Sequence, residues 1–495
     1  MTAPSTTATT PNGQAAQVAA LLTAARDNLL AYCCAVDPKY IPYAWHKYLC
    51  RRLEAAIRRG RARLLIFAPP QHGKSALVSC KLPAWVMGRH PDWPVIAASY
   101  GVDLAERNGK AVRDLIGSPM HGAIFPASRL DGSSTAKTDF QTTAGGQYYG
   151  TTVMGGGTGF SSKLFVVDDP FKSRAEADSE VVRERVKDWY RSVVYSRLAE
   201  DAVLILMHTR WHEDDLAGWL LREHAHEDWE VINLPALALE NDALGREVGQ
   251  ALCPERYSEA ALELKRIASG SRDWEALYMQ RPVAGTGGFF KRAWLREYDS
   301  LPIQIARPMN RYLLVDPAGS KAKRSDFTAV VVVGLNTDGR YYLLDAVRDK
   351  LSLRERAALV IRMHRKWKPH KVGYEKYGKD ADIEHLTMAM EAENYRFTVH
   401  ELGGQMSKEA RIKRLEPDFE NGRWWLPRAL PKALHDGKPV DVIERFVNEE
   451  YLTFPAGVHD DMLDSMARIY DIGAVFPKGT GSVRRASASD STFAW

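Results

Sequence analysis

The sequence predicts an α/β protein with two domains and a linker between them. Residues 16–265 alternate short apolar runs with stretches of helical spacing, which is typical of a parallel sheet covered by helices. Residues 308–475 instead open with three apolar runs in succession, and the last two meet across Asp338-Gly339, a strong hairpin signal. The intervening RPVAGTGG stretch breaks every periodicity, so we place a linker at residues 266–307.

Composition and charge set broad limits. The 495 residues suit two to four domains, and 45% hydrophobic with 26% charged residues is ordinary for a globular protein. The net charge of +5 neither requires nor opposes nucleic-acid binding. No apolar run could span a bilayer, no secretory signal opens the chain, and residues 1–15 and 476–495 are expected to be disordered. The five cysteines lack metal-ligand or redox spacing and are expected to be reduced thiols: Cys33, Cys34, Cys50, Cys80 and Cys253.

The first domain contains a phosphate-loop pattern. Its expected strands are Leu64–Ala68, Val95–Ser99, Leu164–Val167 and Val203–Met207, and Val182, Val186, Trp189 and Val193 share one helical face. The first strand runs into PPQHGKS, where Gln71, His72, Gly73, Lys74 and Ser75 would cradle phosphates. Lys74 would supply charge at the β- and γ-phosphates and Ser75 a ligand for Mg²⁺. Ala68 stands where such a loop usually has its first glycine, and a simple turn before a buried helix remains the alternative.

Two further strand ends carry polar residues. Leu164–Val167 leads into Asp168 and Asp169, so we expect Asp168 to hold Mg²⁺ through water and Asp169 to orient the attacking water. Glu180 is a weaker substitute for Asp169, and two adjacent acids can also cap a helix. Thr209 follows the strand Val203–Met207 and could contact the γ-phosphate, although a polar loop cluster is equally consistent with this pattern.

The second domain has the opening order of a ribonuclease-H-like fold. Three strands, Tyr312–Val315, Thr328–Gly334 and Tyr341–Ala346, precede a helix with Leu353, Ala357, Ile361 and His364 on one face and then the strand Lys371–Tyr374. Asp316 and Glu375 end two of these strands, and Asp460, Asp461 and Asp464 begin a C-terminal amphipathic helix. Such acids can bind two Mg²⁺ or Mn²⁺ ions for phosphodiester hydrolysis. A solvated carboxylate or a helix cap is the alternative for each acid alone.

Other charged residues of this domain are expected to be less central. Asp326 and Asp345 are predicted to be structural or peripheral. The basic residues Lys408, Arg411, Lys413 and Arg414 fall on a probable helix. They could contact DNA phosphates or form a solvated helix face.

The ordered motifs APPQHGKS, SYGVDLAERNGKAVRDLI, LFVVDDPFKS, WYRSVVYSRL and HTRWHEDDL resemble the ATPase half of bacteriophage terminase large subunits. The later WEALYMQRPV and GGFF resemble the segment that joins that half to the nuclease, and the order strand-Asp, strand-Glu, HDD-helix resembles the terminase nuclease. The resemblance implies an N-terminal P-loop NTPase domain and a C-terminal RNase H-like nuclease that package viral double-stranded DNA. It also implies ATP, Mg²⁺ or Mn²⁺, a portal protein, a small terminase subunit, a homo-oligomeric ring and the cytoplasm of an infected bacterium.

The resemblance also assigns residues. Asp169 and Thr209 would serve ATP hydrolysis and its coupling to movement, and Asp316, Glu375 and Asp461 would be the leading nuclease residues. Asp460 would be a further metal ligand, with Asp464 in reserve. Tyr40, Trp45 and His46 lie where an adenine-contacting segment is expected. Many relatives have Arg where this chain has Gln71, so another arginine, from this or a neighbouring subunit, would have to stabilise charge. A helicase or translocase-nuclease of DNA repair and a non-catalytic adaptor on the portal remain the alternatives.

Overall fold

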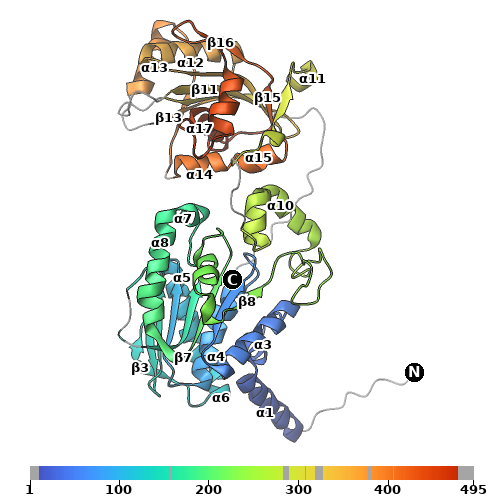
Figure 1. Cartoon of the computed structure of the whole chain (residues 1–495), viewed down its shortest axis with the longest axis vertical. Coiled ribbons are helices and arrows are strands. Elements are labelled where there is room, and N and C mark those ends of the chain that lie inside the picture. The colour runs from blue at the N-terminus through green and yellow to red at the C-terminus, as the bar shows by residue number, and fades with distance from the viewer. Residues whose placement is uncertain are drawn as a thin grey trace, which may run out of the picture. The chain divides into compact units, whose positions relative to one another are not determined.

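A computed structural model describes residues 11–156, 159, 161–282, 289–306, 308–317, 327–376, 381–404 and 406–477. Most of the two tails predicted to be disordered, residues 1–15 and 476–495, lies outside these residues, as do most of RPVAGTGG and Asp326. The prediction is wrong for residues 11–15, because a helix begins at Pro11. The chain divides into two compact units, Met1–Ala284 and Gly285–Trp495 (Figure 1), and each is described by itself. The division falls inside the stretch 266–307 that the sequence marks as a linker, and that stretch also contains helical turns and a strand. Within the described residues, every helix is too short or too polar to cross a membrane.

The first unit contains an eight-stranded sheet of order β3-β4-β5-β2-β6-β7-β1-β8. Its strands are β1 (Arg63–Phe67), β2 (Val95–Ser99), β3 (Leu130–Thr135), β4 (Asp139–Thr142), β5 (Gln147–Thr152), β6 (Ser162–Asp168), β7 (Leu198–His208) and β8 (Glu230–Asn233). The strands from β5 to β8 in this order are all parallel, which confirms the predicted parallel sheet. The antiparallel β3 and β4 extend the sheet, and their polar sequences gave no apolar run from which to predict them.

Helices cover both faces of this sheet. They are α1 (Pro11–Asp27), α2 (Leu29–Val36), α3 (Ala44–Arg59), η1 (Ala76–Lys81), α4 (Leu82–Arg89), α5 (Val102–Ile116), α6 (Pro119–Ile124), α7 (Arg174–Asp178), α8 (Glu180–Trp189), η2 (Tyr190–Val194), η3 (Tyr195–Arg197), α9 (Leu216–Glu223), η4 (Ala225–Glu227), α10 (Glu259–Asp273) and η5 (Trp274–Tyr278). Side chains alternate along β6 and β7, so that Leu164 and Ile205 pack beneath α3 and α4 while Phe165 and Leu204 pack beneath α8 and α9. Two hydrophobic cores therefore hold the central strands rigidly.

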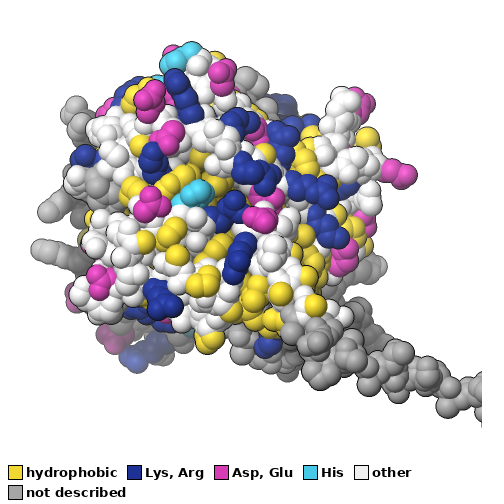
Figure 2. Space-filling model, turned by 90° about the horizontal axis from the view of Figure 1, so that it is seen from below, with side chains coloured by type: hydrophobic (Ala, Val, Ile, Leu, Met, Phe, Trp, Pro, Cys, Tyr) yellow, Lys and Arg dark blue, Asp and Glu magenta, His cyan; other side chains and the backbone are white. Residues whose placement is uncertain are grey.

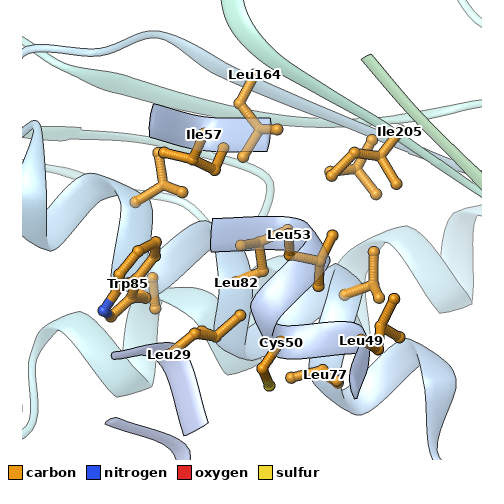
Figure 3. Packing of buried hydrophobic residues seen from close by; sticks show 14 of the residues in the cluster. Leu29, Leu49, Cys50, Leu53, Ile57, Leu77, Leu82, Trp85, Leu164 and Ile205 are labelled. Carbon is orange, nitrogen blue, oxygen red and sulfur yellow. The ribbon is translucent and has the colours of Figure 1, made fainter. Parts of the chain in front are cut away.

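The core beneath α3 fixes the segment that follows the phosphate-loop sequence. Leu77, Leu82 and Trp85, from η1 and α4, are completely buried in it. Figure 3 shows them packed with Leu29 of α2, the α3 side chains and the strand residue Leu164. Burying one such side chain contributes about 1.5–3 kcal/mol, so the first turns after the loop are firmly anchored.

The second unit contains a seven-stranded mixed sheet of order β14-β13-β10-β11-β12-β15-β9, with a separate two-stranded ribbon. The strands are β9 (Arg296–Tyr298), β10 (Asn310–Asp316), β11 (Thr328–Leu335), β12 (Tyr341–Asp349), β13 (Lys371–Glu375), β14 (Val399–Leu402), β15 (Trp424–Pro427), β16 (Pro431–Ala433) and β17 (Pro439–Asp441). Antiparallel β10, β11 and β12 are followed by a helix and by β13, which pairs in parallel with β10. This is the opening order that the sequence predicts.

Helices cover both faces of the second sheet as well. They are η6 (Arg292–Trp294), α11 (Ile303–Ala306), α12 (Leu353–Trp367), α13 (Ala381–Ala392), α14 (Lys408–Lys413), α15 (Glu416–Glu420), α16 (Val442–Phe446), η7 (Val447–Tyr451), α17 (Asp461–Ala467) and η8 (Arg468–Tyr470). Leu313 and Val332 pack with α12, whereas Leu314 and Val331 face α17. Because α17 packs across β10 and β11, its acidic N-terminal turn lies near the strand ends.

The surface carries no uniform charge on the side shown in Figure 2. Lys and Arg side chains there are interspersed with acidic and hydrophobic ones. This mixture agrees with the modest net charge of +5. Charged side chains gather locally instead, at the ends of strands in each unit.

Candidate functional sites

The loop after β1 has the backbone of a phosphate cradle. Gln71 and Gly73 have φ values of +62° and +88°, and Gly73 O accepts the hydrogen bond from Leu77 N at 3.3 Å as the helical segment begins. The hydroxyl of Tyr257 donates to Gln71 Oε1 at 2.9 Å and so braces the loop from outside. His72 is buried against Tyr257, and burial lowers its pKa to about 4, so this imidazole is neutral near pH 7.

The ends of three neighbouring strands meet beside this loop. The order β6-β7-β1 places β7 between the loop strand and the strand that ends in Asp168. Lys74 Nζ donates to Thr209 Oγ1 and lies 3.2 Å from Asp169 Oδ1. Asp169 Oδ1 also accepts from Thr209 N at 2.9 Å. Lys74, Asp169 and Thr209, which the sequence places far apart, therefore form one closed set of contacts.

Asp168 lies deeper than Asp169 and is held by neutral donors. Ser75 Oγ and Ser79 Oγ donate to its two oxygens at 3.2 and 2.7 Å, and Asn108 Nδ2 lies 3.5 Å away. Burial, reinforced by the charge of Asp169, raises the Asp168 pKa to about 6. A buried carboxylate next to the Ser75 hydroxyl is an oxygen-rich setting that suits Mg²⁺.

The backbone turns sharply after Asp168. Asp169 has a φ of +48°, an unfavourable conformation for a side chain other than glycine, and such strain is common at functional sites. Arg210, directly after Thr209, is fixed because its Nε donates to Asp215 at 2.9 Å and its backbone N donates to Gln280 at 3.1 Å. Glu180, the weaker substitute for Asp169, is exposed at the start of α8.

The aromatic segment before α3 also reaches the loop. Trp45 and His46 are buried, and the rings of Tyr40 and His46 stack with centroids 5.2 Å apart. Gly73 lies next to the His46 ring, since a side-chain Cβ at position 73 would be in van der Waals contact with His46 Nε2, 3.9 Å away. This segment therefore packs beside the loop, and its predicted contact with adenine stays a prediction.

The second site lies at the ends of β10 and β13 and the start of α17. Asp316, Glu375 and Asp464 are all buried, and one carboxylate oxygen from each lies within 4.8 Å of the others. Strand ends and the helix thus bring together three acids that are distant in sequence. Burial, together with the neighbouring acids, raises the pKa of Asp316 well above its usual value.

Two buried arginines neutralise part of this acid cluster. Arg411 of α14 donates to Asp464 Oδ2 at 2.6 Å and to Glu375 Oε1 at 3.2 Å. Arg468 donates to both oxygens of Glu375, at 3.1 Å for Oε2. Both arginines were missing from the residues expected here. The spacing of four residues between Asp464 and Arg468, which places them on one helix face, is the signal that could have revealed Arg468.

The other acids surround Lys408. Its Nζ lies 2.8 Å from Asp460 Oδ1, 3.5 Å from Asp461 Oδ1 and 3.9 Å from Asp316 Oδ2. Asp461 is 8% exposed, and its Oδ2 has no hydrogen-bond partner among the described residues. An orphaned buried carboxylate oxygen among further carboxylates fits a hard divalent cation.

Glu450 positions this end of α17. Its Oε2 accepts from the backbone N–H groups of Met462 and Leu463 at 2.8 and 3.1 Å, and Arg348 Nη1 lies 2.5 Å from Oε1. Burial raises the Glu450 pKa to about 7, and Arg348 opposes that shift. Glu450 therefore caps the helix that carries Asp461, a role that the sequence pattern did not indicate.

The predicted basic helix face divides into inner and outer residues. Lys408 and Arg411 contact the acid cluster, whereas Lys413 pairs with Glu409 and Arg414 with Asp471, both at 2.7 Å. Lys408 and Arg411 are thus charge partners of the acids rather than part of a solvated face. Asp345 is structural, as expected, because it is buried and pairs with Lys366 and Lys432.

Comparison with known families decides what these two sites belong to. A family described as terminase large subunit, T4likevirus-type, N-terminal matches residues 65–297. A second, described as terminase RNaseH-like domain, matches residues 313–471. The chain belongs to the terminase large subunits. It is an ATPase and an RNase H-like nuclease of bacteriophage DNA packaging, and the repair translocase-nuclease is not favoured.

Solved structures of phage terminases are similar to this chain at low identity. The large terminase of a thermophilic bacteriophage, in complex with ADP, is 9% identical with a TM-score of 0.42, covering 83% of this chain and 94% of its own. The large terminase of bacteriophage HK97 is 12% identical with a TM-score of 0.32, covering 82% and 90%. The nuclease of the thermophilic phage G20c is 17% identical with a TM-score of 0.25, covering 38% and 98%. No curated protein matches the chain by sequence.

Proposed function

We propose that the phosphate loop Gln71–Ser75 binds ATP with Mg²⁺ and that its hydrolysis drives DNA movement. Lys74 contacts the β- and γ-phosphates, while Ser75 and Asp168 hold the metal, the latter through water. Asp169 orients the attacking water, and Thr209 couples the loss of the γ-phosphate to movement. The observation that carries this assignment is the contact of Lys74 with both Asp169 and Thr209, since it unites the three strand ends at one point.

At the second site, Asp316, Glu375, Asp460 and Asp461 are the residues that would hold Mg²⁺ or Mn²⁺. Asp464 joins them, because its oxygen lies within 4.8 Å of those of Asp316 and Glu375. A metal pair there supplies stabilisation of the attacking and leaving oxygens during phosphodiester hydrolysis. The unpartnered Oδ2 of Asp461 supports this assignment.

The protein's working assembly is also part of the proposal. The chain acts on viral double-stranded DNA in the cytoplasm of an infected bacterium, as a homo-oligomeric ring on the portal protein, together with a small terminase subunit. The ATPase occupies residues 16–265 and the nuclease residues 308–475, joined by 266–307. Because Gln71 is neutral, an arginine from elsewhere, in this chain or a neighbour, stabilises the transferred phosphoryl group.

A packaging assay tests this function. Purified protein is mixed with linear DNA and portal-bearing procapsids, and DNA protected from added nuclease is measured. Protection is expected only with hydrolysable ATP and Mg²⁺, and not when procapsids are omitted. Plasmid nicking is expected to need Mg²⁺ or Mn²⁺ but not ATP hydrolysis. ATP-driven strand separation in the absence of procapsids, with no packaging, would instead favour a helicase.

A further inference from the structure

Lys408 is the least constrained cation of the nuclease centre. It is the first residue of α14, where its ammonium group lies within 4.0 Å of carboxylate oxygens from four aspartates. Its side chain is nevertheless 34% exposed, so the group has a route to solvent. Burial opposes its charge, yet the acids raise the Lys408 pKa, and the ammonium form prevails.

The two arginines cannot take over this role. Arg411 and Arg468 are 4% and 3% exposed and are committed to Glu375 and Asp464 through several hydrogen bonds. Among the described residues, Lys408 is the cation that pairs with Asp316, Asp460 and Asp461.

The chemistry of arginine and lysine suits these different roles, fixed for the two arginines and exchangeable for Lys408. A guanidinium binds a carboxylate through a planar fork of fixed geometry, whereas an ammonium on a flexible stem acts as a point charge that can be replaced by another. The oxygens that Lys408 contacts are also those that the proposed function gives to a divalent ion. Two cations cannot share oxygens at these distances without strong repulsion.

We propose that Lys408 is an exchangeable internal counter-ion, which occupies the cation position of the nuclease centre and leaves it when a divalent ion binds. The inference rests on the proposed metal site. Lys408 stabilises the metal-free domain by neutralising buried acids, and for the same reason it weakens metal binding. Metal loading is then coupled to outward movement of one lysine, which keeps the nuclease inactive at low metal concentration.

Mn²⁺ binding to the full-length chain tests the exchange directly. Isothermal titration without nucleotide compares wild type, Lys408→Gln and the matched control Lys413→Gln, whose lysine pairs with Glu409 on the same helix. Lys408→Gln should bind Mn²⁺ at least about tenfold more tightly, because the competing charge is gone. Lys413→Gln should match wild type. Unchanged or weaker binding by Lys408→Gln would overturn the inference.

Thermal unfolding provides a second measurement. In EDTA, Lys408→Gln should melt below wild type, and saturating Mn²⁺ should raise its melting temperature more than that of wild type. If Lys408→Gln does not fold, Lys408→Arg serves in its place. The Lys408→Arg protein should bind Mn²⁺ more weakly than wild type, because a guanidinium fork held by the acids is harder to displace than an ammonium group. Equal binding by Lys408→Arg and wild type would contradict the exchange. Asp316→Asn separates this inference from the proposed function. If Asp316→Asn binds Mn²⁺ as tightly as wild type does, the proposed metal site itself is wrong. If Asp316→Asn loses Mn²⁺ binding but Lys408→Gln does not gain affinity, only the counter-ion role of Lys408 is wrong.

Discussion

The two sites of this terminase solve the same electrostatic problem in different ways. Each gathers carboxylates at the ends of strands. In the first unit, hydroxyl and amide groups of Ser75, Ser79 and Asn108 hold Asp168, whereas Lys74 forms its ion pair with Asp169. In the second unit, full positive charges surround the acids, and Arg411 and the other cations of the site approach them directly.

The difference indicates how each site meets its ligand. Neutral donors can reorient around an incoming Mg²⁺ at small cost, so the proposed ATP site is close to ready for its ligand. Charged partners have to be displaced or outcompeted, because a cation already neutralises the acids. We therefore expect nucleotide binding to require little rearrangement and metal binding at the nuclease centre to require ion exchange.

The largest effect is expected from Lys74→Ala. No other cation pairs with Asp169 among the described residues, so the mutation removes the positive charge that we propose to meet the β- and γ-phosphates. ATP turnover should fall on the order of 100-fold or more. Steady-state phosphate release measures it. Lys110→Ala removes an exposed lysine paired with Asp114 on α5 and should be normal. Near-normal turnover by Lys74→Ala would refute the site.

Asp316→Ala should break the second site alone. Its carboxylate lies among the proposed metal ligands, so metal-dependent plasmid nicking should fall on the order of 100-fold. ATP turnover should stay nearly unchanged, because the two sites lie in different units. Asp299→Asn, an exposed acid paired with Arg428, is the matched control. Loss of both activities in Asp316→Ala would show that the two domains do not function separately.

Thr209→Ala tests the link between the strand ends. The hydroxyl accepts from Lys74, while the backbone N–H of Thr209 binds Asp169 and survives the mutation. Nucleotide affinity should therefore change less than about tenfold, since one hydrogen bond contributes about 1 kcal/mol, while DNA translocation fails. Thr209→Ser keeps the hydroxyl and should translocate. Equal packaging rates in Thr209→Ala and wild type would disprove the coupling role.

Much of this architecture could be predicted from short patterns. Apolar runs that end in an acid identified the strands that deliver Asp168, Asp316 and Glu375, because a buried strand must be apolar and its tip need not be. The Asp338-Gly339 turn could also be predicted, because such a turn needs a positive φ that glycine adopts readily, and Gly339 has a φ of +83°. These features are local, and local rules suffice for them.

The residues that were missed act across the fold. Arg411 reaches Asp464 over 53 positions and Arg468 reaches Glu375 over 93, so no window of sequence contains either pair. Glu450 likewise caps α17 from a different helical turn. Sequence periodicity indicates which face of an element is buried, but it does not indicate which distant charge meets a buried acid. Counter-ions therefore had to come from the structure.

The most diagnostic effect is an opposite response of the two units to acid. Four buried histidines of the first unit have pKa values lowered to about 4 by burial: His46, His72, His121 and His208. Between pH 6.5 and 4 the unfolded chain binds these protons and the folded chain does not, so stability falls as pH falls. Each histidine lowers the free energy of unfolding by up to about 1.4 kcal/mol per pH unit. Asp168, with its raised pKa, acts in the opposite direction and offsets only part of this loss.

The second unit should respond in the other direction when metal is absent. Glu450 has a pKa of about 7, and those of Asp316, Asp461 and Asp464 are raised, all by burial first. Groups with raised pKa values contribute stability that is complete below their unfolded pKa and is lost as pH rises through the folded one. Lowering the pH from 6.5 to 5.0 in EDTA should therefore stabilise this unit while it destabilises the first. Hydrogen exchange, corrected for intrinsic rates, can follow β1 and β7 separately from β10 and β11 in the full-length chain. Protection that moves in the same direction in both sheets would show that the buried acids are neutralised by their cations at every pH tested, and the contrast between the two sites would then rest on geometry alone.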